Sequence, residues 1–440
     1  MGKTSLGVGE IRQLPGAFGD AFRAIEVLPG VTPIVSGAPY FFVRGAPPGN
    51  TGYFIDGVRV PLLFHFGVAQ SIIHPGLVDH VDFWAGGYPT RFGRFTGGII
   101  HGETRAPAHK KGVHGEYNAR LLDTGVLFEA PVGKDSEVLA AGRVGYPGLL
   151  LRVFAPEARL DYWDYQLRAS TALDAKNRLS VFSFGSHDFI GTVDSDTGET
   201  EGTTIRFHRV DVRWDHQVSR DTRMRVATTV GFDETSLEDS GVRDRLAGAR
   251  VHWESRRSAT LTVRGGADAL FDRYDVLSRD APSGEVGDIG SIPSRSEVSA
   301  GVWADAVWKV TPRYELVPGV RLDYFANDGD APGRRARAGS AWSADPRIAS
   351  RLRVTDELTY VATGGLAHQP PSLPGTIPGF QPGQLRAGLQ TAVQLAQGVE
   401  VALPLELTFA PTLFVSNYLN MTDALTTCDA GYGPTEGCVN

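Results

Sequence analysis

Two stretches decide the fold: residues 41–61, FFVRGAPPGNTGYFIDGVRVP, and residues 76–105, GLVDHVDFWAGGYPTRFGRFTGGIIHGETR. Both consist of short apolar runs interrupted by glycine. The pairs Asp56-Gly57 and Gly97-Gly98 are turn residues, because glycine adopts positive φ angles without steric cost. Such turns allow a chain to reverse direction in little space. The two stretches therefore predict a small, compact domain of short strands.

In order and spacing, these motifs resemble the plug domain of TonB-dependent outer-membrane receptors. The family pattern has an Ile/Val-Arg-Gly step, a strand ending in Asp-Gly-Val-x-Val, a Val-Glu/Asp strand, a glycine turn, a Tyr/Phe-Gly pair and a Gly-Gly-Val/Ile-Ile run. Here these motifs occupy residues 43–45, 55–60, 81–82, 86–87, 92–93 and 97–100. Each motif alone is common, and an unrelated glycine-rich α/β domain is the alternative. Together the motifs are specific.

The rest of this region fits a small α/β unit. Residues 20–30, DAFRAIEVLPG, form a short helical pattern, with Asp20 as the expected N-cap and Gly30 beyond the end. The polar stretch 106–112, APAHKKG, separates this unit from a region with a different pattern of apolar and polar residues. We therefore expect a plug domain at 1–105, a linker at 106–112 and a partial transmembrane β-barrel at 113–440.

After the linker, apolar and polar residues alternate with a period of two. The pattern is clear in residues 223–234, RMRVATTVGFDE, and recurs at 259–272, 297–308 and 314–324, with aromatic residues near the strand ends. The sequence has no apolar run near 18 residues, which excludes a transmembrane helix. Its mean hydropathy of −0.14 is compatible with a membrane barrel, whose strands alternate lipid-facing and lumen-facing residues.

The connections between these strands also alternate. Short ones, such as 174–177 and 311–313, are interleaved with long polar ones, such as 191–204 and 277–296. Membrane barrels have short turns on one side and long loops on the other. A soluble sandwich or propeller is the alternative, but the strands are long for one, since about 9–11 residues already cross a bilayer.

The expected fold is thus mainly β: a small α/β plug followed by an antiparallel transmembrane β-barrel. About 15 strands can be counted, whereas the family barrel has 22, so the barrel is expected to be incomplete. The start lacks a signal peptide and a TonB box before Gly16, and the end reads CVN rather than an amphipathic strand. We expect a piece truncated at both ends that would not insert alone as a sealed channel.

The resemblance implies contacts between plug and barrel. A polar barrel interior offers carboxylate partners such as Asp268, Glu297 or Asp323 to Arg44 and to Arg91 or Arg94. In the family, a plug arginine at the Arg-Gly step pairs with barrel carboxylates, which assigns that role to Arg44. Where many members have a second Arg-Gly-Pro, this chain has residues 85–87, Ala-Gly-Gly. The residues expected to form the plug motif and its contacts are Arg44, Gly45, Asp56, Gly57, Arg91, Gly93, Gly97 and Gly98, with Arg94 as an alternative to Arg91.

Ligands of the family bind loops at the outer apex of the plug. By position these loops are 36–40, 46–51 and 63–67, and the last, LFHFG, offers aromatic and imidazole groups for a metal chelate or a sugar. The ligand-facing candidates are Ser36, Tyr40, Pro48, Asn50, Phe64, His65 and Phe66. The alternative is that His65 is an ordinary plug residue on a packed loop and does not bind a ligand.

Several classes of function find no support in the sequence. The formal charge of −7 gives no basic footprint for nucleic acid. No nucleophile elbow, zinc-protease motif or Walker loop is present, so no catalytic residue, cofactor or metal site is expected. The two cysteines, Cys428 and Cys438, are close enough for a small disulfide loop, with two free thiols as the alternative.

The resemblance implies an importer in the outer membrane of a Gram-negative bacterium. It would take up a scarce nutrient of the siderophore-iron, cobalamin or oligosaccharide class, energised by the TonB–ExbB–ExbD complex. A non-transporting outer-membrane binding or adhesion barrel is the second hypothesis, and a soluble β-rich enzyme is the third.

Overall fold

The structure of the chain is a computed structural model. It describes residues 1–440 except 1, 12–19, 21, 35–39, 67–69, 107–111, 121, 195–196, 198–199, 238–239, 279–293, 332–333, 336–338, 372–376, 382, 384, 386–387, 406 and 422–440. Most of the expected linker and both cysteines lie outside the described residues.

The first part of the chain folds around a small mixed sheet, which we call the plug. The strand order is β1-β6-β7-β4-β5, with β4 parallel to β7 and the other pairs antiparallel. A separate hairpin pairs β2 with β3. The bounds are β1 Lys3–Gly7, β2 Val31–Pro33, β3 Phe41–Val43, β4 Gly52–Ile55, β5 Val58–Arg59, β6 Val78–Trp84 and β7 Ile99–Thr104, with α1 Val8–Ile11, η1 Arg23–Val27, η2 Pro48–Asn50 and η3 Pro75–Leu77.

The helix expected after Asp20 is present but short. Residues Arg23–Val27 form a single 3₁₀ segment, and the Asp20 carboxylate accepts hydrogen bonds from the backbone N–H groups of Phe22 and Arg23. It also accepts one from the N–H of Ser71, at 2.8 Å. Gly30 follows with φ of 84°. Asp20 therefore ties the first turn to a distant loop, as well as holding the start of the helical segment.

The second part is one long antiparallel sheet, which we call the wall. It curls around the plug in a cyclic strand order, although the described residues give no residue register between β24 and β8. Its strands are β8 His114–Ala119, β9 Asp123–Val132, β10 Ser136–Gly145, β11 Ala158–Ala172, β12 Asn177–Val193, β13 Thr200–Ser219, β14 Thr222–Leu237, β15 Ser240–Arg256, β16 Leu261–Ser278, β17 Arg295–Thr311, β18 Tyr314–Ala331, β19 Arg334–Arg335, β20 Gly339–Arg353, β21 Leu358–Gln369, β22 Gln390–Ala402, β23 Thr408–Phe409 and β24 Thr412–Leu419.

The alternation places polar residues inside the wall and apolar residues outside. In β14, Val230 is 55% exposed on the outer face, whereas Thr229 and Asp233 point inward and are buried. The arginines Arg143 and Arg209 are fully buried on the inner face. This inverted pattern, with a polar interior and an apolar exterior, is typical of a membrane barrel. It confirms the mainly β fold class, and fifteen described wall strands have six or more residues.

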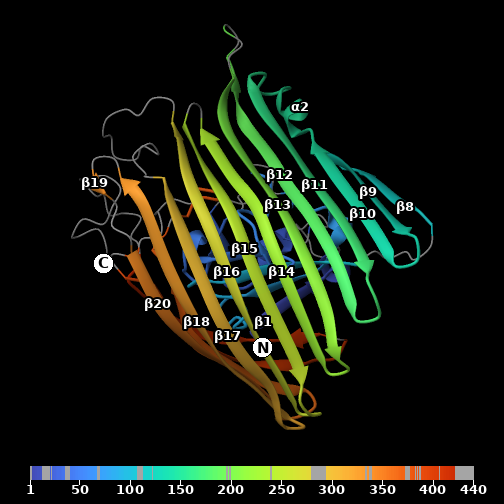
Figure 1. Cartoon of the computed structure of the whole chain (residues 1–440), viewed down its shortest axis with the longest axis vertical. Coiled ribbons are helices and arrows are strands. Elements are labelled where there is room, and N and C mark those ends of the chain that lie inside the picture. The colour runs from blue at the N-terminus through green and yellow to red at the C-terminus, as the bar shows by residue number, and fades with distance from the viewer. Residues whose placement is uncertain are drawn as a thin grey trace.

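The two ends of the wall differ as expected. Tight turns such as 173–176 and 312–313 lie at one end, and the longer connections, including the one that holds α2 (Pro147–Leu151), lie at the other (Figure 1). Strands such as β13, with 20 residues, are about twice as long as a tilted crossing requires. None of the helices in the described residues is long and apolar enough to cross a membrane.

The plug lies against the inner face of the wall, where its blue ribbons are visible behind the green and yellow strands (Figure 1). Its apolar core continues into the wall. Phe41 and Phe64 of the plug belong to the same buried cluster as Phe184 and Phe207, which point inward from β12 and β13. Because the four rings are fully buried, this contact is a dry seal on one side of the plug.

Candidate functional site: the interface between plug and wall

The tip of the β4–β5 hairpin is fastened to the wall by several hydrogen bonds. Asp56 and Gly57 have φ of 51° and 78°, as a tight turn requires. The Asp56 carboxylate accepts hydrogen bonds from the backbone N–H and the hydroxyl of Thr104, at 2.8 and 2.6 Å. Its Oδ2 also accepts from Arg168 and Arg213 of the wall, at 2.8 and 3.5 Å. Burial alone would raise the pKa of Asp56, but these two arginines lower it.

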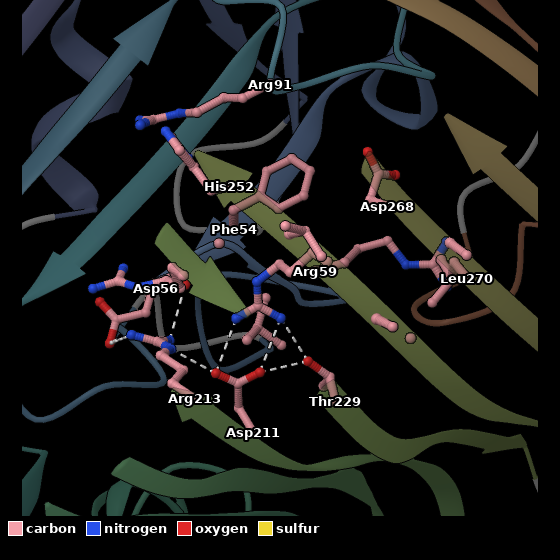
Figure 2. A pocket seen from close by; sticks show the side chains of 18 of the residues that line it. Phe54, Asp56, Arg59, Arg91, Asp211, Arg213, Thr229, His252, Asp268 and Leu270 are labelled. Atoms are coloured by element: carbon pink, nitrogen blue, oxygen red, sulfur yellow. Dashed lines mark hydrogen bonds and ion pairs between the residues drawn. The ribbon is translucent and has the colours of Figure 1, made fainter. Parts of the chain in front are cut away.

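A second carboxylate extends this cluster along the wall. Asp211 of β13 lies 2.7 Å from Arg213 and 2.9 Å from Arg250, and it accepts a hydrogen bond from Thr229 (Figure 2). Together with Asp56 and Arg168, the cluster has three arginines and two aspartates. One positive charge is therefore left uncompensated within it.

Arg59, three residues after Asp56, forms the next link. Its guanidinium lies 2.5 Å from Asp272 and 3.6 Å from Asp244, both on wall strands. Although burial opposes it, the charge of Asp272 raises the pKa of Arg59. The hairpin is thus fastened to the wall through an acid at its tip and a base on its second strand.

A third link involves Arg94. Its guanidinium lies 2.6 Å from Asp268 and 2.9 Å from Asp323, and the wall arginine Arg321 pairs with the same two carboxylates. Gly93 makes this approach possible, since a Cβ at this position would overlap the Arg321 guanidinium. Of the two arginines considered from sequence, Arg94 makes the plug–wall ion pairs.

Arg44 is placed differently from the expectation. It adopts φ of 48°, followed by Gly45 with φ of 85°, and its guanidinium carbon lies 4.4 Å from the centre of the Phe414 ring in β24. Among the described residues, no carboxylate lies within ion-pair distance of Arg44. Two of the carboxylates proposed for it pair with Arg94, and Glu297 pairs with its neighbour Arg295. Burial lowers the pKa of Arg44. The contact is cationic and aromatic rather than ionic.

His65 is enclosed rather than open to a ligand. Its Nδ1 lies 2.9 Å from Asp188 and its Nε2 lies 3.0 Å from Asp164, and the ring stacks on Tyr162 at 4.2 Å. Burial disfavours the charged ring, but the two aspartates raise the pKa of His65 to about 9. At neutral pH, His65 is therefore a doubly donating imidazolium that joins the plug to β11 and β12.

The other ligand-facing candidates also lie mostly inside. Phe64 is fully buried, Tyr40 and Pro48 are buried, and Phe66 is partly buried. Asn50 is buried as well and donates hydrogen bonds to Thr96 and to Gln390 of β22. Ser36 lies outside the described residues. The described candidates therefore contribute to plug packing and to plug–wall contact in this structure.

The paired glycines of the motif allow close packing inside the plug. A Cβ on Gly97 would lie 2.8 Å from the carbonyl oxygen of Asn50, and one on Gly98 would lie 2.8 Å from that of Trp84. Backbone atoms cannot move aside as a flexible side chain can. Only glycine fits at these two positions without a shift of the backbone.

A polar cavity lies between the plug and the inner face of the wall. It has a volume of about 1200 Å³ and extends from Lys176 and Gln217, near the tight turns, to Gln381 and Leu385, near the long connections. Its lining includes eleven lysines and arginines but nine aspartates and glutamates. In a chain with a net charge of −7, this passage is therefore biased toward positive charge. Arg91 lines it, beside His252 (Figure 2).

Sequence reasoning named Asp268 and Asp323, which pair with Arg94, but missed other wall partners of the plug. Four of these partners point inward from wall strands: Arg168, Arg213, Asp164 and Asp188. Because alternate residues of a strand face the same side, the alternation visible in the sequence could have placed these four on the inner face. Their pairing with particular plug residues could not be read from parity. Among the described residues, no group of three or more histidine, cysteine or acidic side chains could hold a metal ion.

Comparison with known proteins agrees with this architecture. The chain is 31% identical over 121 residues to the TonB-dependent transporter Oar of Myxococcus xanthus, a match that covers 25% of this chain and 11% of that protein. It thus spans about a tenth of that relative's length. No family model matches the chain.

Solved structures share the fold over nearly the whole chain. A mutant of the ferric enterobactin receptor PfeA from Pseudomonas aeruginosa aligns with a TM-score of 0.70 and 15% identity, covering 95% of this chain and 72% of that one. The siderophore receptor PirA from the same organism aligns with 0.68 and 15%, covering 95% and 75%. The iron transporter FrpB from Neisseria meningitidis aligns with 0.68 and 13%, covering 91% and 70%. The resemblance to TonB-dependent receptors thus holds in sequence and in fold.

Proposed function

We propose that this chain forms the plug and a large part of the barrel of a receptor that imports a scarce nutrient across the outer membrane of a Gram-negative bacterium. Residues 1–105 would be the plug, 106–112 the linker and 113–440 the barrel portion. The observation that carries the proposal is the ionic fastening of the plug: an acidic hairpin tip, Asp56, and a basic residue, Arg94, are each held by wall residues of opposite charge.

This fastening fits a gate better than a permanent stopper. Several arginines and aspartates lie next to one another along the cavity. A plug residue that leaves one wall partner can therefore pair with another wall residue that has the same charge as the first partner. Oar and FrpB are named as transporters, and PfeA and PirA as receptors; none of the four is named as an enzyme. Three of these four proteins are named for siderophores or iron, which supports an iron chelate as the first substrate class to test, ahead of cobalamin and oligosaccharides.

Energy for import would come from the TonB–ExbB–ExbD complex, since a plug held by several buried ion pairs does not leave its position spontaneously. The decisive experiment is uptake of ⁵⁵Fe-labelled chelates by cells that carry the intact gene, with and without TonB. We expect uptake that depends on both the gene and TonB. Uptake that is unchanged without TonB would disprove the proposal.

The second hypothesis, a binding or adhesion barrel without transport, gives a different outcome in the same cells. Labelled ligand would then associate with the cell surface but would not enter, whether or not TonB is present. Protease treatment of intact cells separates bound from internalised label, so the two functions are distinguished in one assay.

A further inference from the structure

Arg91 is a cation without a matching anion in the part of the chain that the structure describes. Its guanidinium carbon lies 4.8 Å from the centre of the Phe92 ring, and no described carboxylate lies within ion-pair distance. The side chain lines the cavity, where Figure 2 shows it next to His252. Burial and the nearby Arg264 lower the pKa of Arg91, while Glu103 acts in the opposite direction. An uncompensated guanidinium in such a place is costly unless something else supplies the negative charge.

A second unsatisfied group, His101, lies on strand β7 of the plug. The ring of His101 is 5.4 Å from that of Phe92 and also lines the cavity. Its Nε2 accepts a hydrogen bond from the N–H of Gly57, and burial lowers the pKa of His101 to about 3. The neutral ring must then hold its proton on Nδ1, which has no hydrogen-bond partner among the described residues.

The nearby cluster around Asp56 adds to the positive charge. Three arginines there share two carboxylates, and all three, Arg168, Arg213 and Arg250, line the same cavity. An approaching anion would therefore meet a positive field without having to displace an existing ion pair of Arg91. A cation would be repelled, and a neutral solute would leave Arg91 uncompensated.

We propose that this part of the cavity binds a small oxyanion, a carboxylate or phosphate group of the solute, with Arg91 as its main ligand. The planar guanidinium offers two parallel N–H groups to such a group, and His101 Nδ1–H and His252, which line the same cavity, add further donors. The inference deepens the proposed function, on which its role in import rests: the imported solute would carry an oxyanion through the passage between plug and wall.

The test is a binding measurement on the full chain folded in detergent, by titration calorimetry with citrate and, separately, with inorganic phosphate. We expect saturable binding of at least one anion, weakened by added salt because the contact is ionic. Arg91→Met should weaken binding at least about tenfold, and Arg91→Lys should recover part of the loss. The matched control is Arg245→Met, since Arg245 is 60% exposed on the outer face and paired with Asp275. Its binding should match that of the unmodified chain.

Unchanged binding in Arg91→Met, equal loss in both methionine variants, or no saturable binding of either anion would overturn the proposal. Trypsin resistance of the plug reports whether each variant folds, and if Arg91→Met does not, Arg91→Gln decides in its place. The measurement involves neither TonB nor uptake. A failure here leaves the import proposal standing, and TonB-independent uptake leaves the anion site standing.

Discussion

The carboxylate of Asp56, at the tip of the plug hairpin, lies 2.8 Å from the guanidinium of Arg168 on the wall strand β11. These two residues are 112 positions apart in the chain. The contact connects the family-like Asp-Gly turn to an inward-facing barrel position, so the motif has a second role beyond turn formation. It makes the turn part of the plug–wall fastening.

Replacing Asp56 with asparagine should loosen the plug. The amide keeps the shape but removes the charge that Arg168 and Arg213 share, and loss of one partner of a buried pair costs about 3–5 kcal/mol. We expect trypsin to cut the plug at a clearly lower urea concentration than in the unmodified chain. Asp79→Asn, at a side chain that is 61% exposed, is the control and should leave the midpoint unchanged. Equal midpoints for both variants would contradict the role of Asp56.

Plug stability should depend on pH through His65. Its folded pKa of about 9 lies above the unfolded value of 6.5, so the imidazolium stabilises the folded state fully below about pH 6.5. This contribution, on the order of 3 kcal/mol, is lost as the pH rises from 6.5 to 9. The thermal midpoint measured from pH 6 to 10 should fall across this window.

Variants make the assignment specific. In His65→Gln the decline between pH 6.5 and 9 should disappear, because no group at this position titrates. His80→Gln, at a partly exposed histidine that contacts Asp79, is the matched control and should retain the decline. A decline that persists in His65→Gln would assign the pH dependence to another group.

Gly93→Ala should disturb the cluster of Arg94 and Arg321. The added methyl group would overlap the Arg321 guanidinium, which is buried and fixed by two carboxylates and therefore cannot easily move. We expect a loss of about 1–3 kcal/mol in plug stability, measured by urea-dependent protection from trypsin. Gly9→Ala, where a Cβ would meet nothing within 4 Å, should be neutral. A neutral Gly93→Ala would show that Arg321 can relocate.

The dry seal should contribute strongly to stability. Phe184→Ala removes a fully buried ring that packs edge to face on Phe207, and such a change costs about 3–5 kcal/mol. The expected result is a marked drop in the thermal midpoint of the folded chain in detergent. Phe154→Ala removes an equal ring that is 88% exposed and should have little effect. Similar midpoints for the two variants would argue against the seal.

The sequence by itself determined the fold class and the turns. Alternation with a period of two in residues 223–234 required a strand with two unlike faces, and the glycines at 57, 97 and 98 required close turns and close packing. These are local properties, because side-chain parity and backbone sterics act between near neighbours along the chain. The predicted strands were therefore found where the alternation placed them.

Only the tertiary structure decided which residues meet. Arg94 rather than Arg44 holds the wall carboxylates, His65 is enclosed by Asp164 and Asp188 instead of facing a ligand, and Arg91 is left facing the cavity. Such pairings depend on how the plug is rotated and seated within the wall. That placement is set by the sum of many contacts between distant segments, which no local pattern in the chain encodes.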